Sequence, residues 1–293
     1  MELLQIEPKR RVIDSKWETM RVCFLGDFQY AGKKAHGTAL GKLKDTIAEE
    51  VERGAYFIGM GDYIDFLSPS NRQRLRSAAL YDTAEDVIDE KSMELTHEIF
   101  DLALRPTVGR WFGLVEGHHF AQLKDGSTTD MRLCEMLKAP FLGTCGVLRI
   151  NFARTNNALG VTLWVHHGHG NGQTGYYPLA RLAGFSASQE GVDAFAIGHT
   201  TKLGHLLTNR MGYQWRRSGS GKAYHRTIHL IGTGGYSRAY VEGAKQGRVP
   251  RGGYAEQQML GPAVIGSPTL IIRPVRDCSS GGETIYPVLK VEA

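Results

Sequence analysis

Two kinds of apolar spacing alternate along the first half of the chain. Short runs of consecutive apolar residues are typical of buried strands, and they fall at 22–25, 56–60 and 111–115. Between these runs, apolar residues recur every three or four positions, which predicts helices at 38–53 and 83–104. Gly54 ends the first helix, and the second ends before Pro106.

The second half reads mainly as strands. A short helix is predicted at 128–138, and further strands are predicted at 147–152, 161–165, 195–197, 228–231 and 269–272. From residue 203 onward many glycines interrupt the pattern, which favours short strands joined by loops. We therefore expect an α/β fold with a large, loop-rich C-terminal part.

The composition is that of an ordinary soluble protein. The chain has 293 residues, of which 42% are apolar and 22% charged, so a disordered or collagen-like chain is excluded. No apolar run approaches the roughly 18 residues needed to span a bilayer. The four cysteines form no C-x-x-C pair and the N-terminus has no apolar leader, which favours a reduced cytosolic setting. We expect a single domain over residues 1–293.

Glycine is abundant, at 36 residues, and many of the glycines flank an acid or a histidine. Five predicted strands end in such a stretch, which carries Asp27, Asp62, His118 with His119, His166 with His167, or His199. Ligands of α/β proteins gather beyond the carboxyl ends of strands, so these side chains would converge on one edge if the strands share a sheet. Carboxylates together with neutral imidazoles are ligands of Zn, Mn and Fe. The sequence therefore predicts a metal site.

The order of these stretches resembles the calcineurin-like metallophosphoesterase family, whose motifs run D-x-H, G-D-x-x-D, G-N-H-[DE], H-G and G-H-x-H. The matching stretches here begin at Asp27, Gly61, Gly117, His167 and Gly198, and they cover roughly residues 20–205. The spacing is also similar to that of uncharacterised members common in phage and prophage genomes. The resemblance implies a β-sandwich flanked by helices, with a dinuclear metal site.

The resemblance also implies a role for each matching residue. Asp62 would bridge two metal ions. His118, His167 and His199 would complete the shell of one ion, and Asp27 and Gln29 would hold the other. His119 would be the general acid that protonates the leaving oxygen, and Asp65 would orient its ring.

Two positions depart from the family pattern on the same side of the site. Gln29 and Thr201 stand where the family has histidines, whereas His118 replaces an asparagine on the other side. Oxygen donors suit Mn²⁺ or Mg²⁺ better than imidazole does, so we expect unequal sites and favour Mn over Zn, Fe or Ni. Three further histidines are alternative ligands, namely His166, His169 and His205. Phe66 stands where the Ser/Thr phosphatase subgroup has a phosphate-gripping arginine, which argues against a protein phosphatase.

Basic character is concentrated in residues 202–254. This segment holds ten Lys or Arg residues and one acid, with six Tyr or Trp residues among them. Cations for phosphates and aromatic rings for bases are typical of a surface that binds single-stranded nucleic acid. Candidate substrate contacts are Trp215, Arg216, Arg217 and, from the H-G-H stretch, His169. A solvated glycine-rich loop is the alternative.

These observations favour a metal-dependent phosphoester hydrolase, with a phosphodiesterase acting on nucleic acid or nucleotide as the first expectation. A phosphomonoesterase for a small phosphorylated metabolite is one alternative. A non-catalytic binding scaffold of the same fold is the other. The pairing of His119 with Asp65 favours an enzyme, because a scaffold does not need a proton donor. No membrane partner is expected.

Overall fold

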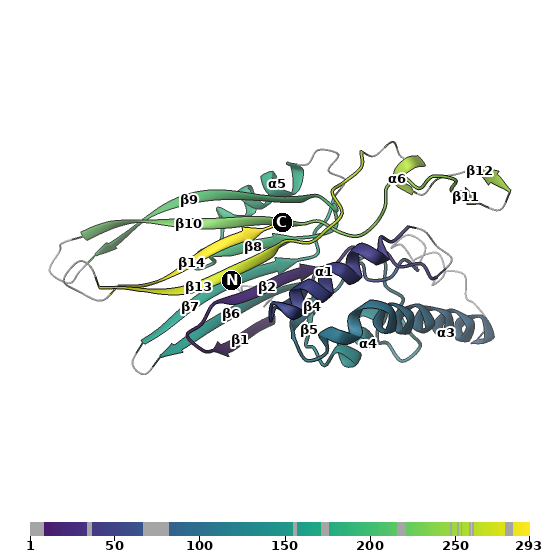
Figure 1. Ribbon diagram of the computed structural model, residues 1–293, viewed down its shortest axis with the longest axis horizontal. Helices are drawn as coiled ribbons and strands as arrows, with labels where there is room; N and C mark the ends of the chain where they lie inside the picture. The colour runs from purple at the N-terminus through teal and green to yellow at the C-terminus, as the bar shows by residue number, and fades with distance from the viewer. Residues whose placement is uncertain are drawn as a thin grey trace, which may run out of the picture.

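Two six-stranded mixed sheets form the body of the protein (Figure 1). The computed structural model describes residues 9–33, 37–66, 82–154, 157–170, 176–215, 221–246, 248–250, 252, 254–257, 259, 261–278 and 284–293. Both sheets combine parallel and antiparallel pairs, and helices accompany each of them. The predicted α/β class is confirmed.

The first sheet has the strand order β14-β13-β2-β3-β4-β5. Its parallel strands are β2 (Met20–Leu25), β3 (Tyr56–Gly59), β4 (Trp111–Val115) and β5 (Phe141–Gly143). The antiparallel strands β13 (Thr269–Asp277) and β14 (Thr284–Glu292) complete it. Three helices connect the parallel strands, namely α1 (Leu40–Glu52), α3 (Asp82–Ile99) and α4 (Thr129–Leu137).

The second sheet has the order β1-β6-β7-β8-β10-β9. Its strands are β1 (Lys9–Ser15), β6 (Cys145–Arg154), β7 (Asn157–His166), β8 (Ala194–Ile197), β10 (Gly221–Thr233) and β9 (Leu203–Trp215). Helix α5 (Tyr177–Ser186) packs on its outer face through Leu179 and Leu182. Smaller elements are β11 (Lys245–Gln246), β12 (Val249–Pro250) and α6 (Tyr254–Gln257).

Strand alternation divides the apolar side chains between cores on the two faces of the first sheet. In β2, Cys23 and Leu25 pack with helices α1, α3 and α4, whereas Val22 and Phe24 belong to a different cluster. That second cluster also includes side chains of β6, β7, β8 and β10, such as Leu163. Since both sheets contribute to it, they share one apolar core.

Most predicted elements of the first half are confirmed, with changes at their ends. Helix α3 stops at Ile99 and continues as a π-helical turn, Phe100–Leu104, and a 3-10 turn, Arg105–Thr107. The expected short strands after residue 203 are wrong for β9 and β10, which are 13 residues long and pair without a register break. Helix α5 was not predicted, because Pro178 and Gly184 lower its apparent helix propensity.

Candidate metal centre

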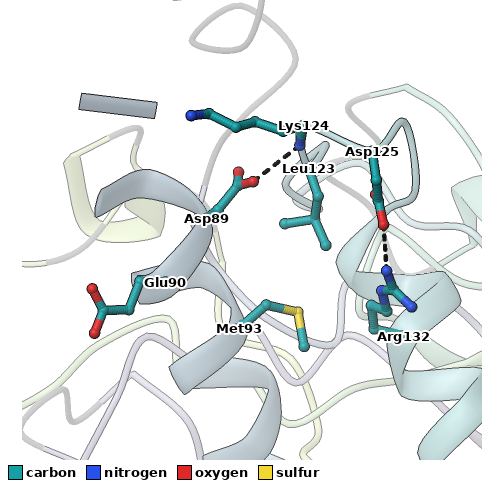
Figure 2. Close-up of a pocket in the computed structure, with 7 residues that line it drawn as sticks. All are labelled: Asp89, Glu90, Met93, Leu123, Lys124, Asp125 and Arg132. Carbon is teal, nitrogen blue, oxygen red and sulfur yellow. Dashed lines mark hydrogen bonds and ion pairs between the residues drawn. The ribbon is translucent and has the colours of Figure 1, made fainter. Parts of the chain in front are cut away.

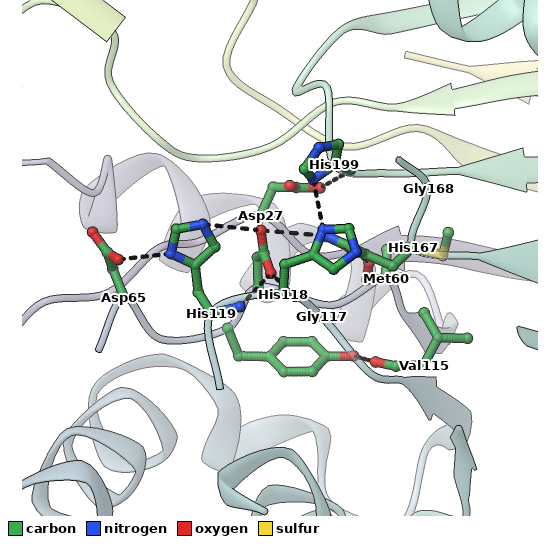
Figure 3. A network of polar contacts seen from close by, with 12 residues as sticks. Asp27, Met60, Asp65, Val115, Gly117, His118, His119, His167, Gly168 and His199 are labelled. Atoms are coloured by element: carbon green, nitrogen blue, oxygen red, sulfur yellow. Dashed lines mark hydrogen bonds and ion pairs between the residues drawn. The ribbon is translucent and has the colours of Figure 1, made fainter. Parts of the chain in front are cut away.

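The candidate residues lie on five loops, which follow β2, β3, β4, β7 and β8. The first three of these strands belong to one sheet and the other two to the second sheet, so the five strands do not share a single sheet edge. The side chains nevertheless converge, as Figure 3 shows, because the carboxyl ends of both sets of strands meet at one end of the shared core. The described residues include two groups of three ligand atoms, and the atoms within each group lie within 4.8 Å of one another. One group comes from His118, His167 and His199, and the other comes from Asp27, Asp62 and His167.

Left-handed backbone conformation is concentrated at this point of the chain. Seven described non-glycine residues have a positive φ, and five of them belong to the candidate motifs. These five are Asp27 (50°), Gln29 (46°), Asp62 (51°), His199 (66°) and Thr201 (52°). Each such residue costs about 1–3 kcal/mol and persists only where the surrounding structure imposes it. The loops are therefore held in a conformation that the chain would not adopt by itself.

Two glycines explain the flanking pattern seen in the sequence. A Cβ on Gly117 would lie 2.1 Å from the backbone nitrogen of Asp62. Gly61 has a φ of +90°, and a Cβ there would lie 2.5 Å from Nδ1 of His167. Because neither position has room for a side chain, the loops of β3, β4 and β7 can pack directly on one another.

The two aspartates each use one carboxylate oxygen to hold the backbone. Oδ2 of Asp27 accepts a hydrogen bond from the backbone N–H of His199 at 3.0 Å. Oδ1 of Asp62 accepts from the N–H groups of His118 and His119, at 2.5 Å and 3.1 Å. The second oxygen of each aspartate is buried and has no hydrogen-bond donor within the described structure. Each aspartate thus offers one oxygen to a ligand.

His167 completes this buried group. Its Nδ1–H donates to the carbonyl of Met60 at 2.6 Å, so in the neutral ring Nε2 carries the lone pair that a metal ion would use. Nε2 lies 3.3 Å from Oδ2 of Asp62, at ion-pair distance but without hydrogen-bond geometry. Six buried side-chain atoms of the described residues lack a hydrogen bond, and three of them are Nε2 of His167, Oδ1 of Asp27 and Oδ2 of Asp62. A divalent cation would satisfy all three, so the residues present fit a metal ion.

His118 and His199 lie next to His167. Their Nδ1 atoms are 3.1 Å apart, and their ring planes stand at 85° with centroids 4.7 Å apart. Burial, followed by the charge of His167, lowers the pKa of each to about 4. Both rings are therefore neutral at pH 7, which is the protonation state that binds a metal.

Charge is unevenly distributed over the buried group. Burial raises the pKa of Asp27 to about 7. Burial also opposes the charged form of Asp62, but the neighbouring His167 outweighs it and holds the pKa of Asp62 well below its usual range. Burial likewise disfavours charge on His167, whereas Asp62 raises its pKa to about 9. Without a metal, Asp62 and His167 thus form a buried ion pair, and a cation would replace the proton on His167.

His119 and Asp65 stand at the rim. Nδ1 of His119 is 2.8 Å from Oδ1 of Asp65 (Figure 3). Its Nε2 is 4.0 Å from Oδ2 of Asp62. The His119 side chain is 25% exposed, so it can reach a bound molecule. Burial acts to lower the pKa of His119, but the hydrogen bond to Asp65 and the charge of Asp62 outweigh it and raise that pKa.

Gln29, Thr201 (which stands where the family has a histidine ligand) and His169 occupy different places. The backbone N–H of Gln29 donates to the carbonyl of Asp62 at 2.9 Å, which puts Gln29 beside the site. The Thr201 hydroxyl donates to the carbonyl of Thr200 at 2.8 Å. His169 is exposed, with its ring centroid 6.1 Å from that of His118, so it lies at the rim.

The other two alternative histidines belong to neither ligand group. Nδ1 of His166 accepts from the N–H of Gly168 at 2.7 Å, and its ring stacks on Trp164. Nε2 of His205 lies 3.0 Å from Nδ1 of His229, in a separate stacked pair.

The basic segment leads away from the site. Arg216, Arg217 and the side chain of Trp215 lie outside the described residues. The backbone of Trp215 ends β9, and the 13 residues of this strand span about 40 Å at 3.3 Å per residue. Although residue 202 follows His199 closely in sequence, the far end of β9 is therefore distant from His199 in space, and β10 returns from there toward the site.

Two structural contributors were not identified from the sequence. Asp130, buried near the start of α4, accepts a hydrogen bond from the N–H of Gly117 at 2.9 Å, and burial raises its pKa to about 7. The N–H of Tyr236 donates to the carbonyl of Asp27 at 2.9 Å. Gly235 also packs on Asp27, so close that a Cβ there would lie 2.7 Å from the Cβ of Asp27. Neither residue belongs to a motif of the sequence, and only the fold connects Asp130 and Tyr236 to the site.

A separate cavity of about 370 Å³ lies between α3 and the loop that follows His119 (Figure 2). Both cations that line it, Lys124 and Arg132, have acidic partners. The backbone N–H of Lys124 donates to Asp89 at 3.0 Å, its Nζ donates to Asp86 at 2.6 Å, and Arg132 pairs with Asp125. None of the candidate metal ligands lines this cavity, so we assign it to anchoring the loop on α3.

Comparisons with known proteins leave the family open. No protein-family model matches the chain, and no curated protein matches it. Among solved structures, the crystal structure of Chaetomium thermophilum Vps29 is similar to it, with 9% identity over 93% of this chain and 96% of that chain. The TM-score is 0.26, and at that value the likeness carries no argument. Within the described residues, no helix is both long and apolar enough to cross a membrane.

Proposed function

We propose that this protein is a metal-dependent phosphoester hydrolase that cleaves phosphodiesters of nucleic acid or nucleotides with water. The metal-holding residues are Asp62, His118, His167 and His199 on one side, and Asp27 and Gln29 on the other. A bound divalent cation lowers the pKa of water toward neutrality and stabilises charge on the phosphoryl oxygens. We also propose that the two sheets form the β-sandwich of the metallophosphoesterases, and that the protein is similar to the phage-type members of that family.

One observation carries the proposal. The three buried, hydrogen-bond-deficient atoms of Asp27, Asp62 and His167 face one another, beside two neutral histidines and within reach of the His119–Asp65 pair. A purely structural cluster would satisfy these atoms internally, because an unpaired buried polar group costs about 1–3 kcal/mol. The arrangement therefore suits a site that binds a cation and delivers a proton nearby.

His119 supplies the proton in this proposal. When its ring is doubly protonated, Nδ1–H donates to Asp65, and Nε2–H is left for the oxygen of the departing group. Asp65 fixes the ring orientation and stabilises its charged form, which keeps a larger fraction of His119 protonated at neutral pH. His119 does not need to hold the metal, because it belongs to neither ligand group.

The residues around the site favour two metal ions bound with unequal affinity and a phosphodiester substrate. Gln29 offers an amide oxygen, so the side with Asp27 is richer in oxygen donors and suits Mn²⁺. Phe66 packs against the core formed with the helices, so this position supplies no cation for the doubly charged phosphate of a monoester. A diester carries one charge less on its phosphate.

The test is a substrate panel with matched variants. Protein stripped of metal would be supplied with Mn²⁺, Zn²⁺, Mg²⁺ or Ni²⁺ and assayed on an aryl phosphodiester, an aryl phosphomonoester and single-stranded DNA. We expect diester hydrolysis, strongest with Mn²⁺. His119→Ala should lower kcat on DNA by about 10²–10⁴-fold with little change in metal content. His205→Ala, a histidine outside both ligand groups, is the control and should behave as wild type.

Each contrary result identifies an alternative. Hydrolysis of the monoester alone would indicate a phosphomonoesterase. Metal binding without hydrolysis of any substrate would indicate a binding scaffold. Loss of metal in His119→Ala would make His119 a ligand rather than a proton donor.

A further inference from the structure

The β9–β10 hairpin extends well past the strands that support it (Figure 1). Strand β8 pairs with β10 only from His229 to Gly232. Among the described residues, β10 before His229 pairs with β9 alone. We call residues 206–213 of β9 and 222–227 of β10 the arm. A two-stranded ribbon is only marginally stable in water by itself. Because the arm contributes little to the core, its exposed side chains are candidates for binding a partner.

One face of the arm gathers its cations. Helix α5 covers the same face nearer the site, where Ile228 and Leu230 pack beneath it. Beyond α5 this outer face carries Arg210, Lys222, Tyr224 and Arg226, because paired strand residues share a face and alternate along it. No acid occurs in residues 202–241, although the chain has 30.

Arg210 and Arg226 are direct cross-strand partners. Like charges in that position destabilise a sheet. Asp193 neutralises Arg226 through contacts of 3.2 Å and 2.7 Å, whereas within the described part of the chain Arg210 donates to the neutral carbonyl of Gln189. Lys222 is exposed and has no described partner. The face thus retains positive charge that an anionic partner would compensate and that a second copy of the chain would repel.

Tyr224 gives the same face an aromatic surface. Its ring covers Gly212 on the neighbouring strand, where a Cβ would lie 2.4 Å from Cζ of the tyrosine. The residue is still 48% exposed, so the side of the ring away from Gly212 is open to solvent. An unpaired base can stack on such a ring, whereas the bases of a duplex are already stacked on one another.

We propose that the outer face of the arm is a docking surface for single-stranded nucleic acid, with Tyr224 under a base and Lys222 on the backbone phosphates. This inference rests on the proposed function, because it makes a nucleic-acid strand the substrate of the metal centre. Tyr224 pairs with Gly212, nine residues along β9 from Leu203, which is about 30 Å from the start of the hairpin. Only a polymeric substrate can touch the arm and the site together.

Binding is measured on the full chain with a fluorescently labelled oligothymidylate of about 15 nucleotides, within the usual range of single-strand site sizes. A chelator is present, so that hydrolysis plays no part. Tyr224→Ala should weaken binding by about tenfold or more, and Tyr224→Phe should restore it. Tyr213→Ala is the matched control: Tyr213 is 60% exposed on the opposite face of the arm and should have no effect.

The salt dependence of oligonucleotide affinity tests the contact made by Lys222. Replacing Lys222 by alanine should flatten the log–log slope of affinity against salt by about 0.7, the value for one phosphate contact on a single strand. Lys44→Ala, an exposed lysine on α1, should leave the slope unchanged. None of these variants should alter hydrolysis of the small aryl diester, which reports on the metal centre alone.

Three outcomes overturn the arm proposal. Equal affinity for a duplex of the same length would show that unpaired bases do not contribute to binding. Binding to vesicles of anionic lipid but not to the oligonucleotide would make the arm a membrane surface. Equal weakening of binding by Tyr213→Ala and Tyr224→Ala, with unchanged melting temperatures, would show that binding is not confined to the outer face. If the aryl diester is not hydrolysed but these binding results hold, the proposed function fails while the docking surface stands.

Discussion

The metal centre and the arm carry their chemistry in opposite ways. At the centre, five residues adopt left-handed backbone conformations, glycines pack without room for a Cβ, and buried polar atoms lack hydrogen bonds. In the arm, β9 and β10 pair in unbroken register, and the functional candidates are exposed side chains. The centre therefore depends on how the backbone is packed, and the arm depends on which side chains it displays.

This difference predicts different tolerance to mutation. A change in the backbone at the centre should disturb several ligands at once, because the loops of both sheets hold one another. A change in the arm should affect one contact and leave the fold intact. The following experiments break or sharpen this contrast.

The largest effect is expected from Gly117→Ala. The new methyl group would meet the backbone of Asp62 at 2.1 Å, so the loops of β3 and β4 must separate. We expect loss of metal binding and a decrease in unfolding free energy of about 1–3 kcal/mol, as for other overpacked sites. Metal analysis and chemical denaturation measure both. Gly184→Ala in α5 is the control, since nothing lies within 4 Å of its Cβ and helix propensity should stabilise it by about 0.5–1 kcal/mol.

Metal content comes next. The side with three imidazoles should bind more tightly than the side with Asp27 and Gln29, so protein purified without added metal should hold nearer one ion than two. At a free metal concentration about 1,000-fold above Kd, the ion should add about 4 kcal/mol of stability. Elemental analysis and thermal melting with and without chelator check this. Two equivalents that survive prolonged chelation would contradict the unequal sites.

A smaller effect is expected at Asp130, which holds the loop of His118 through Gly117 N–H. Asp130→Ala should weaken metal affinity by about 10–100-fold, the range for residues that orient ligands from behind. Asp130→Asn keeps an acceptor oxygen and should remain close to wild type. Titration with Mn²⁺ distinguishes the two variants, and equal loss in both would point to a need for the charge of Asp130 instead.

The subtlest effect concerns the pH profile. The general acid is active when protonated, so kcat/KM should fall as the pH rises through the pKa of His119. The hydrogen bond to Asp65 raises that pKa. Asp65→Asn should therefore move the alkaline limb to lower pH, which a pH–rate profile with an alkyl diester detects. An unchanged limb would mean that His119 is not the titrating acid.

The centre could be predicted from the sequence to a greater extent than the arm. Strand endings followed by glycine-flanked acids and histidines are local signals. They led to the two groups of residues whose ligand atoms lie within 4.8 Å of one another in each group. Asp130 could not be found in this way, because its hydrogen bond joins residues 13 positions apart through tertiary packing. In the arm, glycines and exposed apolar residues hid two long strands, since neither face alternates cleanly.

The sequence by itself determined which residue types end the strands, where most helices of the first half lie, and that residues 202–254 are basic. These properties follow from local spacing and composition. Only the tertiary structure decided that the five loops come from two sheets, that His167 is close to both Asp27 and His118, and that residues 206–213 of β9 and 222–227 of β10 lie away from the site. Those facts depend on how the sheets pack over a shared core, which fixes distances between residues that no local pattern relates.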